Sequence, residues 1–290
     1  MDLFLQQTLS GLATGAIYAS IALAVVMIYQ AIDHFNFAQG EMAMFSAFIA
    51  WQLIDWGANY WVAFFVCIVV SFVGGVVIER LVFAPIHNAP ILSHIVVFIA
   101  LFQIFNATAG FIWEFTIKAF PSPFPDKMPY GIKLIGAHEV GIVGITLGML
   151  ILIYLFFRFT PIGLAMRAAA AAPDSARLVG ISVGWMLALG WGLAAAIGAV
   201  AGMMIAPIVY LEPNMMLGIL LYGFAGAVVG GLTSPLGAVL GGFLLGVLEN
   251  LAGTYIIGSE LKLTFALVVI VGILIFKPSG LMGRVVVQRV

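Results

Sequence analysis

Long apolar runs separated by short polar stretches organise the chain. About nine such runs can be distinguished, and most are long enough for a helix that crosses a bilayer. Glycines and a Ser234–Pro235 pair divide one of the last stretches into two short halves, as is typical of transporter helices. The pattern predicts an all-α bundle of about eight or nine spans with broken or re-entrant segments. The runs cover about residues 9–29, 42–56, 62–78, 95–113, 140–157, 184–208, 217–232, 236–250 and 263–276.

The composition leaves little room for an aqueous domain. The chain is 64% hydrophobic and 8% charged, with a mean hydropathy of +1.20, whereas a soluble domain is about 45–50% apolar and about 25% charged. We therefore expect a polytopic membrane protein in which residues 1–290 form a single transmembrane domain. The net charge of −1 gives no sign of nucleic-acid binding. The first residues carry no Lys or Arg, so no signal peptide is expected.

No pattern for catalysis or metal binding is found. The single cysteine, Cys67, excludes a disulfide within the chain and a cysteine metal cluster, and the four histidines are scattered. Residues 180–184 match the G-x-S-x-G nucleophile pattern, but no strand precedes them and no His–acid pair accompanies them. The sequence contains no P-loop, so any ATP hydrolysis must belong to another polypeptide. We expect a protein that is not an enzyme and that itself binds no metal or cofactor.

Residues 160–183 form a polar interruption between two long apolar runs. They contain three charges, Arg167, Asp174 and Arg177. The Pro-Ile-Gly start is expected to end the preceding helix, and residues 164–172 favour a short helix. Pro173 interrupts that helix or opens a second one, which Gly180 can end. A short helix held outside the bilayer is suited to binding a soluble partner, although an ordinary basic loop would have the same composition.

A second polar group follows the first apolar run. Five polar residues lie there between two apolar runs: Asp33, His34, Asn36, Gln39 and Glu41. Unwound backbone at membrane depth is tolerated only beside protein or a water-filled cavity. Glu41 is thus a candidate for the translocation path. A carboxylate near a helix N-terminus is also stabilising by itself, so a plain capping role stays open.

Three motifs resemble Liv-type permeases, the LivH branch of the ABC importers for branched-chain amino acids. The word Asn-Phe-Ala-Gln-Gly-Glu at residues 36–41 is similar to the family's Asn-Phe-Ala-His-Gly-Glu, with Gln39 in place of the usual His. Residues 230–242 resemble the glycine-rich C-terminal region. The third motif resembles the cytoplasmic coupling loop and consists of Gly163, Ala165, Arg167 and Ala168, then Ala176, Leu178, Gly180 and Ile181. Together the resemblance spans about residues 11–250.

The resemblance implies a type II ABC importer-like fold and a permease subunit that forms the path for branched-chain or related amino acids. A periplasmic binding protein would deliver the solute, and two separate ATPase subunits, with their ATP and Mg²⁺, would drive transport. The partner permease would be a second Liv-type chain or a second copy of this one. Residues 160–183 would dock on the ATPase through Gly163, Arg167, Ala168, Asp174, Arg177, Leu178 and Gly180. The predicted path residues are Asn36, Phe37, Gln39, Glu41, Glu249 and Asn250.

An ion-coupled secondary transporter is the alternative. Such carriers usually keep ionisable residues inside their helices, and here only Glu249 and Glu41 are plausible intramembrane acids. Permeases of this type also carry amides, urea or small aromatic acids, and a path of Gly, Ala, Val and Phe would not discriminate among them.

Basic residues predict the orientation in the bacterial inner membrane. With the coupling stretch inside, the cytoplasmic side holds seven basic residues and the other side four, which places the C-terminus in the cytoplasm. Nine spans would then put the N-terminus outside. The outer loops at 114–139 and 212–214 would face a binding protein or serve as passive connections. The predicted cytoplasmic basic residues are Arg80, Arg158, Arg167, Arg177, Lys277, Arg284 and Arg289. The predicted outer basic residues are Lys118, Lys127, Lys133 and Lys262.

Overall fold

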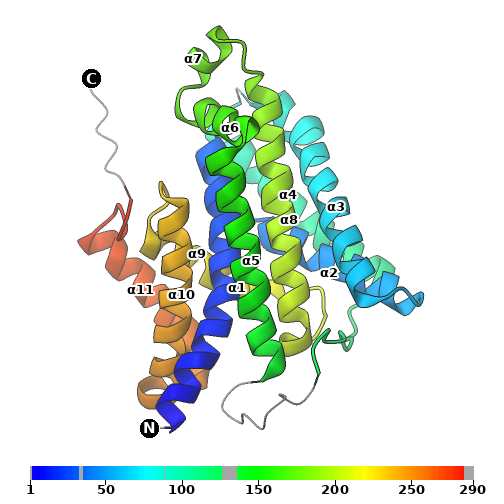
Figure 1. Cartoon of the computed structure of the whole chain (residues 1–290), viewed down its shortest axis with the longest axis vertical. Coiled ribbons are helices and arrows are strands. Elements are labelled where there is room, and N and C mark those ends of the chain that lie inside the picture. Colours follow the sequence, from blue (N-terminus) through cyan, green and yellow to red (C-terminus); the bar gives the residue numbers. More distant parts are fainter. Residues whose placement is uncertain (1, 33–34, 88, 126–135, 284–290) are drawn as a thin grey trace. The chain divides into compact units, whose positions relative to one another are not determined.

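A computed structural model describes residues 2–32, 35–87, 89–125 and 136–283 of the chain (Figure 1). The chain divides into two compact units. Unit 1 consists of Met1–Val26, Ser122–Thr146 and Leu217–Val290, and unit 2 of Met27–Pro121 and Leu147–Met216. Six residues named above lie outside the described part of the chain: Asp33, His34, Lys127, Lys133, Arg284 and Arg289.

Each of the predicted apolar runs forms a helix. Within the described residues, seven helices are long and apolar enough to cross a membrane, and α9 is a shorter apolar helix. Helix α2, with 17 residues, is also shorter. The prediction of a polytopic helical bundle is thus confirmed. The nine helices are α1 (Asp2–Ile32), α2 (Gln39–Asp55), α3 (Tyr60–Ile78), α4 (Ile91–Trp113), α5 (Ala137–Phe159), α8 (Val183–Val209), α9 (Met216–Gly230), α10 (Pro235–Ala252) and α11 (Lys262–Phe276).

Two helices continue beyond their predicted ends. A π-helical turn, Glu79–Phe83, and a 3₁₀ turn, Ala84–Ile86, extend α3, and a π-helical turn, Gly253–Ile257, extends α10. Glu79 and Arg80, which follow the predicted run of residues 62–78, thus continue the helix. Glu79 is buried, and the Arg80 guanidinium lies 3.9 Å from the centre of the Trp185 ring.

Glycines set the helix contacts of unit 1. A Cβ added to Gly11 would lie 2.9 Å from Val247 Cα, and a Cβ added to Gly15 would lie 2.9 Å from Phe243 Cα. On the facing helix, a Cβ on Gly246 would collide with the Gly15 backbone. The small-residue face that Gly11 and Gly15 form on α1 therefore packs directly against α10, in the manner of close helix pairs in membranes.

The start of α1 and the end of α11 lie at opposite ends of unit 1. The Gln7 carbonyl accepts a hydrogen bond from Asn250 Nδ2, at the end of α10. The chain that follows α11 instead meets the start of α10 and the end of α9, where the amide of Met282 donates to the Gly230 carbonyl over 2.9 Å.

Helix α8 is the centre of unit 2. Trp191 is fully buried, and its ring lies 4.4 Å from that of Phe83. A Cβ added to Gly202 would collide with the Ala43 carbonyl, and one on Gly198 would lie 2.5 Å from Gln39 Nε2. The GxxxG pair that Gly198 and Gly202 form on α8 thus brings the start of α2 to within backbone contact of α8.

We predict that Gly246→Val destabilises the protein, because the added side chain has no room between α10 and α1. Overpacking of this kind costs about 1–3 kcal/mol, which thermal unfolding of the detergent-solubilised protein would show as a lower midpoint. Gly272→Val on α11 is the matched control, since a Cβ there meets nothing within 4 Å. Equal midpoints for the two variants would contradict the close contact.

Candidate functional site

The stretch 160–183 forms two short helices between α5 and α8 (Figure 1). Helix α6 covers Pro161–Ala171 and helix α7 covers Pro173–Leu178. The Thr160 hydroxyl accepts a hydrogen bond from the Gly163 amide over 3.0 Å and so caps α6. Pro161 opens α6 instead of only ending α5, so α6 begins three residues before the predicted start, since proline is favoured in a first helical turn.

The second short helix follows the predicted pattern. Pro173 opens α7, Asp174 lies in its first turn, and Gly180 adopts a φ of +86°, a value that favours glycine. A Cβ added to Gly163 would lie 2.5 Å from the Phe156 carbonyl oxygen, so α6 folds closely back on the end of α5. The close contact at Gly163 and the turn at Gly180 therefore fix where α6 and α7 join the neighbouring helices.

One face of this loop is buried and the other is exposed. Ala169, Ala176 and Val183 pack together as a small core. On the outer face Arg167 is exposed and the Leu178 side chain is 89% exposed. Ala168 is half-buried. Asp174 and Arg177 form an exposed ion pair over 3.2 Å, which contributes little stability. Of the predicted coupling residues, Gly163 is thus buried against α5 and Ala168 is half-buried, whereas Arg167, Asp174, Arg177, Leu178 and Gly180 are exposed.

Sequence reasoning did not associate His87 with the coupling loop. His87 lies in the connection between α3 and α4, and it lines a shallow pocket together with Pro173, Asp174, Arg177 and Leu187. The loop thus rests against a second connection of unit 2. No local pattern in the sequence could have indicated this contact, because 86 residues or more separate His87 from the others.

The word Asn-Phe-Ala-Gln-Gly-Glu lies at the start of α2, next to the middle of α8. Asn36 Oδ1 accepts a hydrogen bond from the Ala38 amide over 2.9 Å, which closes an Asx-type turn. Gln39 Nε2 donates to the Ala194 carbonyl over 2.9 Å. Ala194 lies roughly 17 Å along α8 from its start at ~1.5 Å per residue. The unwound residues before α2 are therefore deep in unit 2.

The residues of the Asn-Phe-Ala-Gln-Gly-Glu motif lie in different surroundings. Asn36 and Gln39 are buried, whereas the Phe37 side chain is 48% exposed. Glu41 is buried and points toward α4, where Asn106 Nδ2 donates a hydrogen bond to its carboxylate over 3.3 Å. No side-chain hydrogen bond caps α2. The carboxylate thus makes its contact with a neighbouring helix instead of with its own backbone.

Asn106 joins Glu41 to the turn that follows α8. Its Nδ2 also lies 2.9 Å from the Pro213 carbonyl oxygen and 3.1 Å from Asn214 Oδ1. We call Glu41, Asn106, Pro213 and Asn214 the Glu41 cluster. The sequence offered two weak signals for it, an amide inside an apolar run and a Glu-Pro-Asn turn. It gave no indication that the two would meet.

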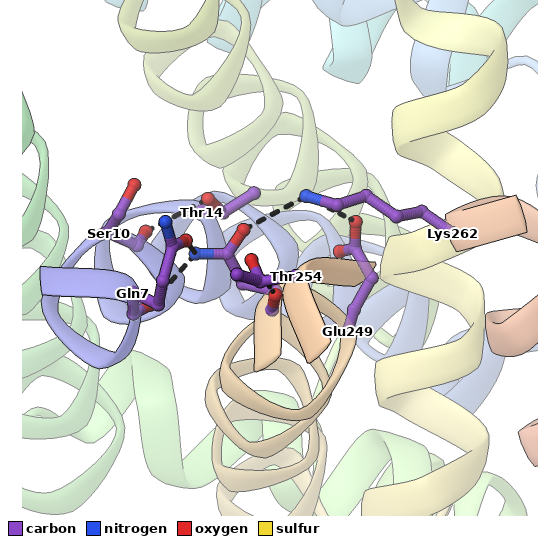
Figure 2. Close-up of polar contacts among 7 residues, drawn as sticks. Gln7, Ser10, Thr14, Glu249, Thr254 and Lys262 are labelled. Carbon is purple, nitrogen blue, oxygen red and sulfur yellow. Dashed lines mark hydrogen bonds and ion pairs between the residues drawn. The ribbon is translucent and has the colours of Figure 1, made fainter. Parts of the chain in front are cut away.

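The other two predicted path residues, Glu249 and Asn250, lie in a network of unit 1 (Figure 2). Lys262 Nζ donates to Asn250 Oδ1 over 2.9 Å and lies 3.7 Å from Glu249 Oε1. Asn250 Nδ2 donates to both oxygens of Gln7, the carbonyl at 2.8 Å and Oε1 at 2.9 Å. The Tyr18 hydroxyl donates to Glu249. We call Gln7, Tyr18, Glu249, Asn250 and Lys262 the Lys262 network.

Sequence reasoning missed Gln7, Tyr18 and Lys262, and it assigned Lys262 to the outer side of the membrane. Lys262 begins α11, and its aliphatic stem crosses Gly253, where an added Cβ would lie 2.5 Å from Lys262 Cε. The amide of Asn250 has partners for both its oxygen and its nitrogen, and Glu249 has both a cation and a donor. This well-satisfied network connects α1, α10 and α11. A path role for Glu249 and Asn250 stays a prediction.

Among the residues that the structure describes, no three His, Cys, Asp or Glu side chains are grouped to hold a metal ion. The residues brought together are instead amides, carboxylates, one lysine and an exposed two-helix loop. Hydrogen bonding, ion pairing and docking are the chemistry that these groups can perform.

Comparison with known proteins agrees with this arrangement. A family model described as "Branched-chain amino acid transport system / permease component" matches residues 7–274. The chain belongs to this family. The permease is 30% identical to BraD, a high-affinity branched-chain amino acid transport system permease protein of Pseudomonas aeruginosa, over 99% of this chain and 98% of that protein. The predicted family is thus confirmed.

Two further relatives cover most of the permease. LivH of Escherichia coli K12, also a high-affinity branched-chain amino acid transport system permease protein, is 30% identical over 99% of this chain and 98% of its own length. A probable LivH of Methanocaldococcus jannaschii is 27% identical over 91% of this chain and 87% of its own. The likeness thus extends over both units of the permease.

We predict that Lys262→Met destabilises the permease by leaving Glu249 buried without its cation. Breaking a fully buried pair costs about 3–5 kcal/mol. The Lys262 side chain is 27% exposed, so a loss of about 1–3 kcal/mol is expected here. A double-mutant cycle with Glu249→Gln, followed by unfolding in detergent, measures the coupling. Additive effects of the two changes would show that the pair does not stabilise unit 1.

Proposed function

We propose that this chain is a membrane-spanning subunit of an ABC importer and forms the path for branched-chain or related amino acids. A periplasmic binding protein delivers the solute, and separate ATPase subunits drive its passage. The observation that carries the proposal is the two-helix loop of residues 160–183. It has a fixed base on α5 and α8 and an outer face that no described residue of this chain covers.

The outer face of the loop suits a groove on a soluble protein. Exposed Leu178 and Val179 offer an apolar tip, and Arg167 and Arg177 offer charge beside it. Apolar anchors surrounded by polar groups are the usual composition of protein interfaces. The ATPase subunits, which carry ATP and Mg²⁺, are the partners that fit a chain without a P-loop.

Contacts within unit 2 provide a route from the loop to the predicted path. Helix α8 begins at Val183, directly after the loop, and Arg80 packs over Trp185 in its first turn. Further along α8, the Ala194 carbonyl holds Gln39 at the start of α2. A displacement of the loop by the ATPase thus passes through α8 to the polar residues at the start of α2. This coupling would support alternating access of the path.

Charge supports a cytoplasmic position for the loop in the inner membrane. Four arginines lie at the loop end of unit 2, namely Arg80, Arg158, Arg167 and Arg177, whereas Lys118 lies at the other end, near Trp51. With the loop inside, the C-terminus of this multi-pass chain is also cytoplasmic. The second permease of the assembly is a Liv-type chain or another copy of this one.

We predict that Arg167→Glu leaves membrane insertion normal and lowers uptake at least about tenfold, because a reversed charge at a docking surface opposes its partner. Uptake of labelled amino acid by cells that contain the complete transporter measures the effect. Lys277→Glu, an equally exposed change after α11, is the control and is expected to transport normally. Retained uptake in the Arg167→Glu variant would count against the docking role.

Co-purification tests the partners directly. We predict that the tagged permease, extracted from its native membrane in detergent, brings a P-loop ATPase with it, and that Leu178→Asp loses this subunit. Leu178 is too exposed for the change to affect folding, so lost recovery reports docking. Leu178→Met keeps the apolar tip and is expected to retain the ATPase. A chain that is isolated alone and moves solute in liposomes without ATP would instead be a secondary carrier.

A further inference from the structure

Arg80 lies where the end of α3 meets the beginning of α8. It belongs to the π-helical turn Glu79–Phe83, and its guanidinium lies 3.9 Å from the centre of the Trp185 ring. Gly184, the second residue of α8, leaves room for this contact, since a Cβ added there would lie 3.4 Å from Arg80 Nη1. Single π-helical turns within α-helices are frequent at functional sites. The contact thus joins α3 to the first turn of α8, directly after the two-helix loop of residues 160–183.

The contact between Arg80 and Glu79 is incomplete. Arg80 Nε lies 3.8 Å from Glu79 Oε2, which is too long for a hydrogen bond. Both atoms are buried, and neither has a hydrogen-bond partner among the described residues. Buried polar atoms are usually hydrogen-bonded, because an unmade bond is unfavourable there. A donor and an acceptor thus lie next to each other without forming the bond that each of them lacks.

Two arrangements are therefore open to the Arg80 side chain. In the one that the structure shows, the guanidinium lies over the Trp185 ring and Nε is unpaired. In the other, Nε donates a hydrogen bond to Glu79 Oε2 and the guanidinium moves away from the indole. A cation over a Trp ring and a hydrogen bond from a charged donor are both favourable. A small displacement of Trp185 is thus enough to change which of the two contacts forms.

The first turn of α8 is packed less firmly than the part that follows it. About two turns further along α8, the buried rings of Phe83, Phe98 and Trp191 hold α3, α4 and α8 together. A Cβ added to Gly75 would lie 2.6 Å from the Trp191 carbonyl oxygen, so α3 and α8 are in backbone contact there. The Trp185 side chain is instead 54% exposed. A displacement of the two-helix loop is therefore expected to move Trp185 while Trp191 stays in place.

We propose that Arg80 is a positioning residue that couples the two-helix loop to α3 by exchanging Trp185 for Glu79 as its partner. When the ATPase displaces the loop, the first turn of α8 moves with it, Trp185 leaves the guanidinium, and Arg80 Nε donates to Glu79. Each position of this turn then has its own favourable contact, as an element with two discrete states requires. The inference rests on the transport function proposed above and adds a residue that lies outside the docking surface.

The test measures solute uptake and ATP hydrolysis together, with the complete transporter in liposomes. Arg80→Met keeps an apolar stem but can make neither contact. The ATPase is expected to co-purify with this variant at the wild-type level and to hydrolyse ATP. The amount of solute moved per ATP is expected to fall at least about fivefold, the lower end of the usual coupling between two sites. A purely structural role would lower the thermal midpoint and the yield without changing that ratio.

Three further variants make the outcome specific. Arg158→Met removes an exposed arginine in the last turn of α5 and is expected to keep the wild-type ratio. Trp185→Leu removes only the ring and is expected to lower the ratio as well. Because Trp185 is more than half exposed, this variant is expected to fold and carries the test if Arg80→Met does not. The double variant of Arg80→Met and Trp185→Leu is expected to lose no more than Arg80→Met alone, since both changes break one contact.

A wild-type ratio of solute to ATP in either folded single variant, or losses that multiply in the double variant, would overturn the role of Arg80. This failure can be separated from that of the importer. If no ATPase joins the wild-type chain, the proposed importer function fails. If an ATP-driven transporter assembles and its Arg80→Met variant stays fully coupled, only the exchange of partners at Arg80 fails.

Discussion

Every polar group of this protein that enters the bilayer must find its partners within the protein, because hydrocarbon supplies none. The structure provides such partners in three ways, and a few buried side-chain atoms, among them Gln39 Oε1 and Trp191 Nε1, have no hydrogen-bond partner among the described residues. Backbone groups are paired within helices, the charges of Glu79 and Arg80 are held by contacts inside unit 2, and the Lys262 network joins a lysine, an amide and a carboxylate in unit 1. Long helices with few charges are the consequence at the level of sequence.

The two polar groups of the protein differ in how fully they are paired. In the Lys262 network each oxygen and nitrogen of the Asn250 amide has a partner, and Glu249 has a cation. In the Glu41 cluster Asn106 Nδ2 lies within hydrogen-bonding distance of three oxygens, and no Lys, Arg or His of the described residues forms an ion pair with Glu41. The Lys262 network thus holds α1, α10 and α11 through an ion pair and a fully paired amide, whereas Glu41 is contacted by an amide instead of a cation.

Close approach of backbones is the second constraint, and glycine makes it possible. Gly15 and Gly246 bring α1 and α10 together, and Gly202 brings α8 to the backbone of α2. At Gly198 and Gly253 the missing Cβ instead leaves room for a polar side chain, Gln39 in one case and Lys262 in the other. Glycine positions thus determine both which helices touch and where a polar side chain can pass between them.

The sequence by itself determined the apolar helices, a short helix within residues 160–183 and the family of the permease, and it left open whether Pro173 interrupts that short helix or opens a second one. These features follow from local chemistry: apolar runs form spans, prolines open short helices, and motifs are contiguous. Only the tertiary structure decided which polar residues meet. Asn106 and Asn214 join Glu41 across more than 60 residues, and Lys262 enters a buried network instead of an outer loop. The reason is physical, because the partner of a buried polar group is set by helix packing, and no periodicity along the chain encodes that distance.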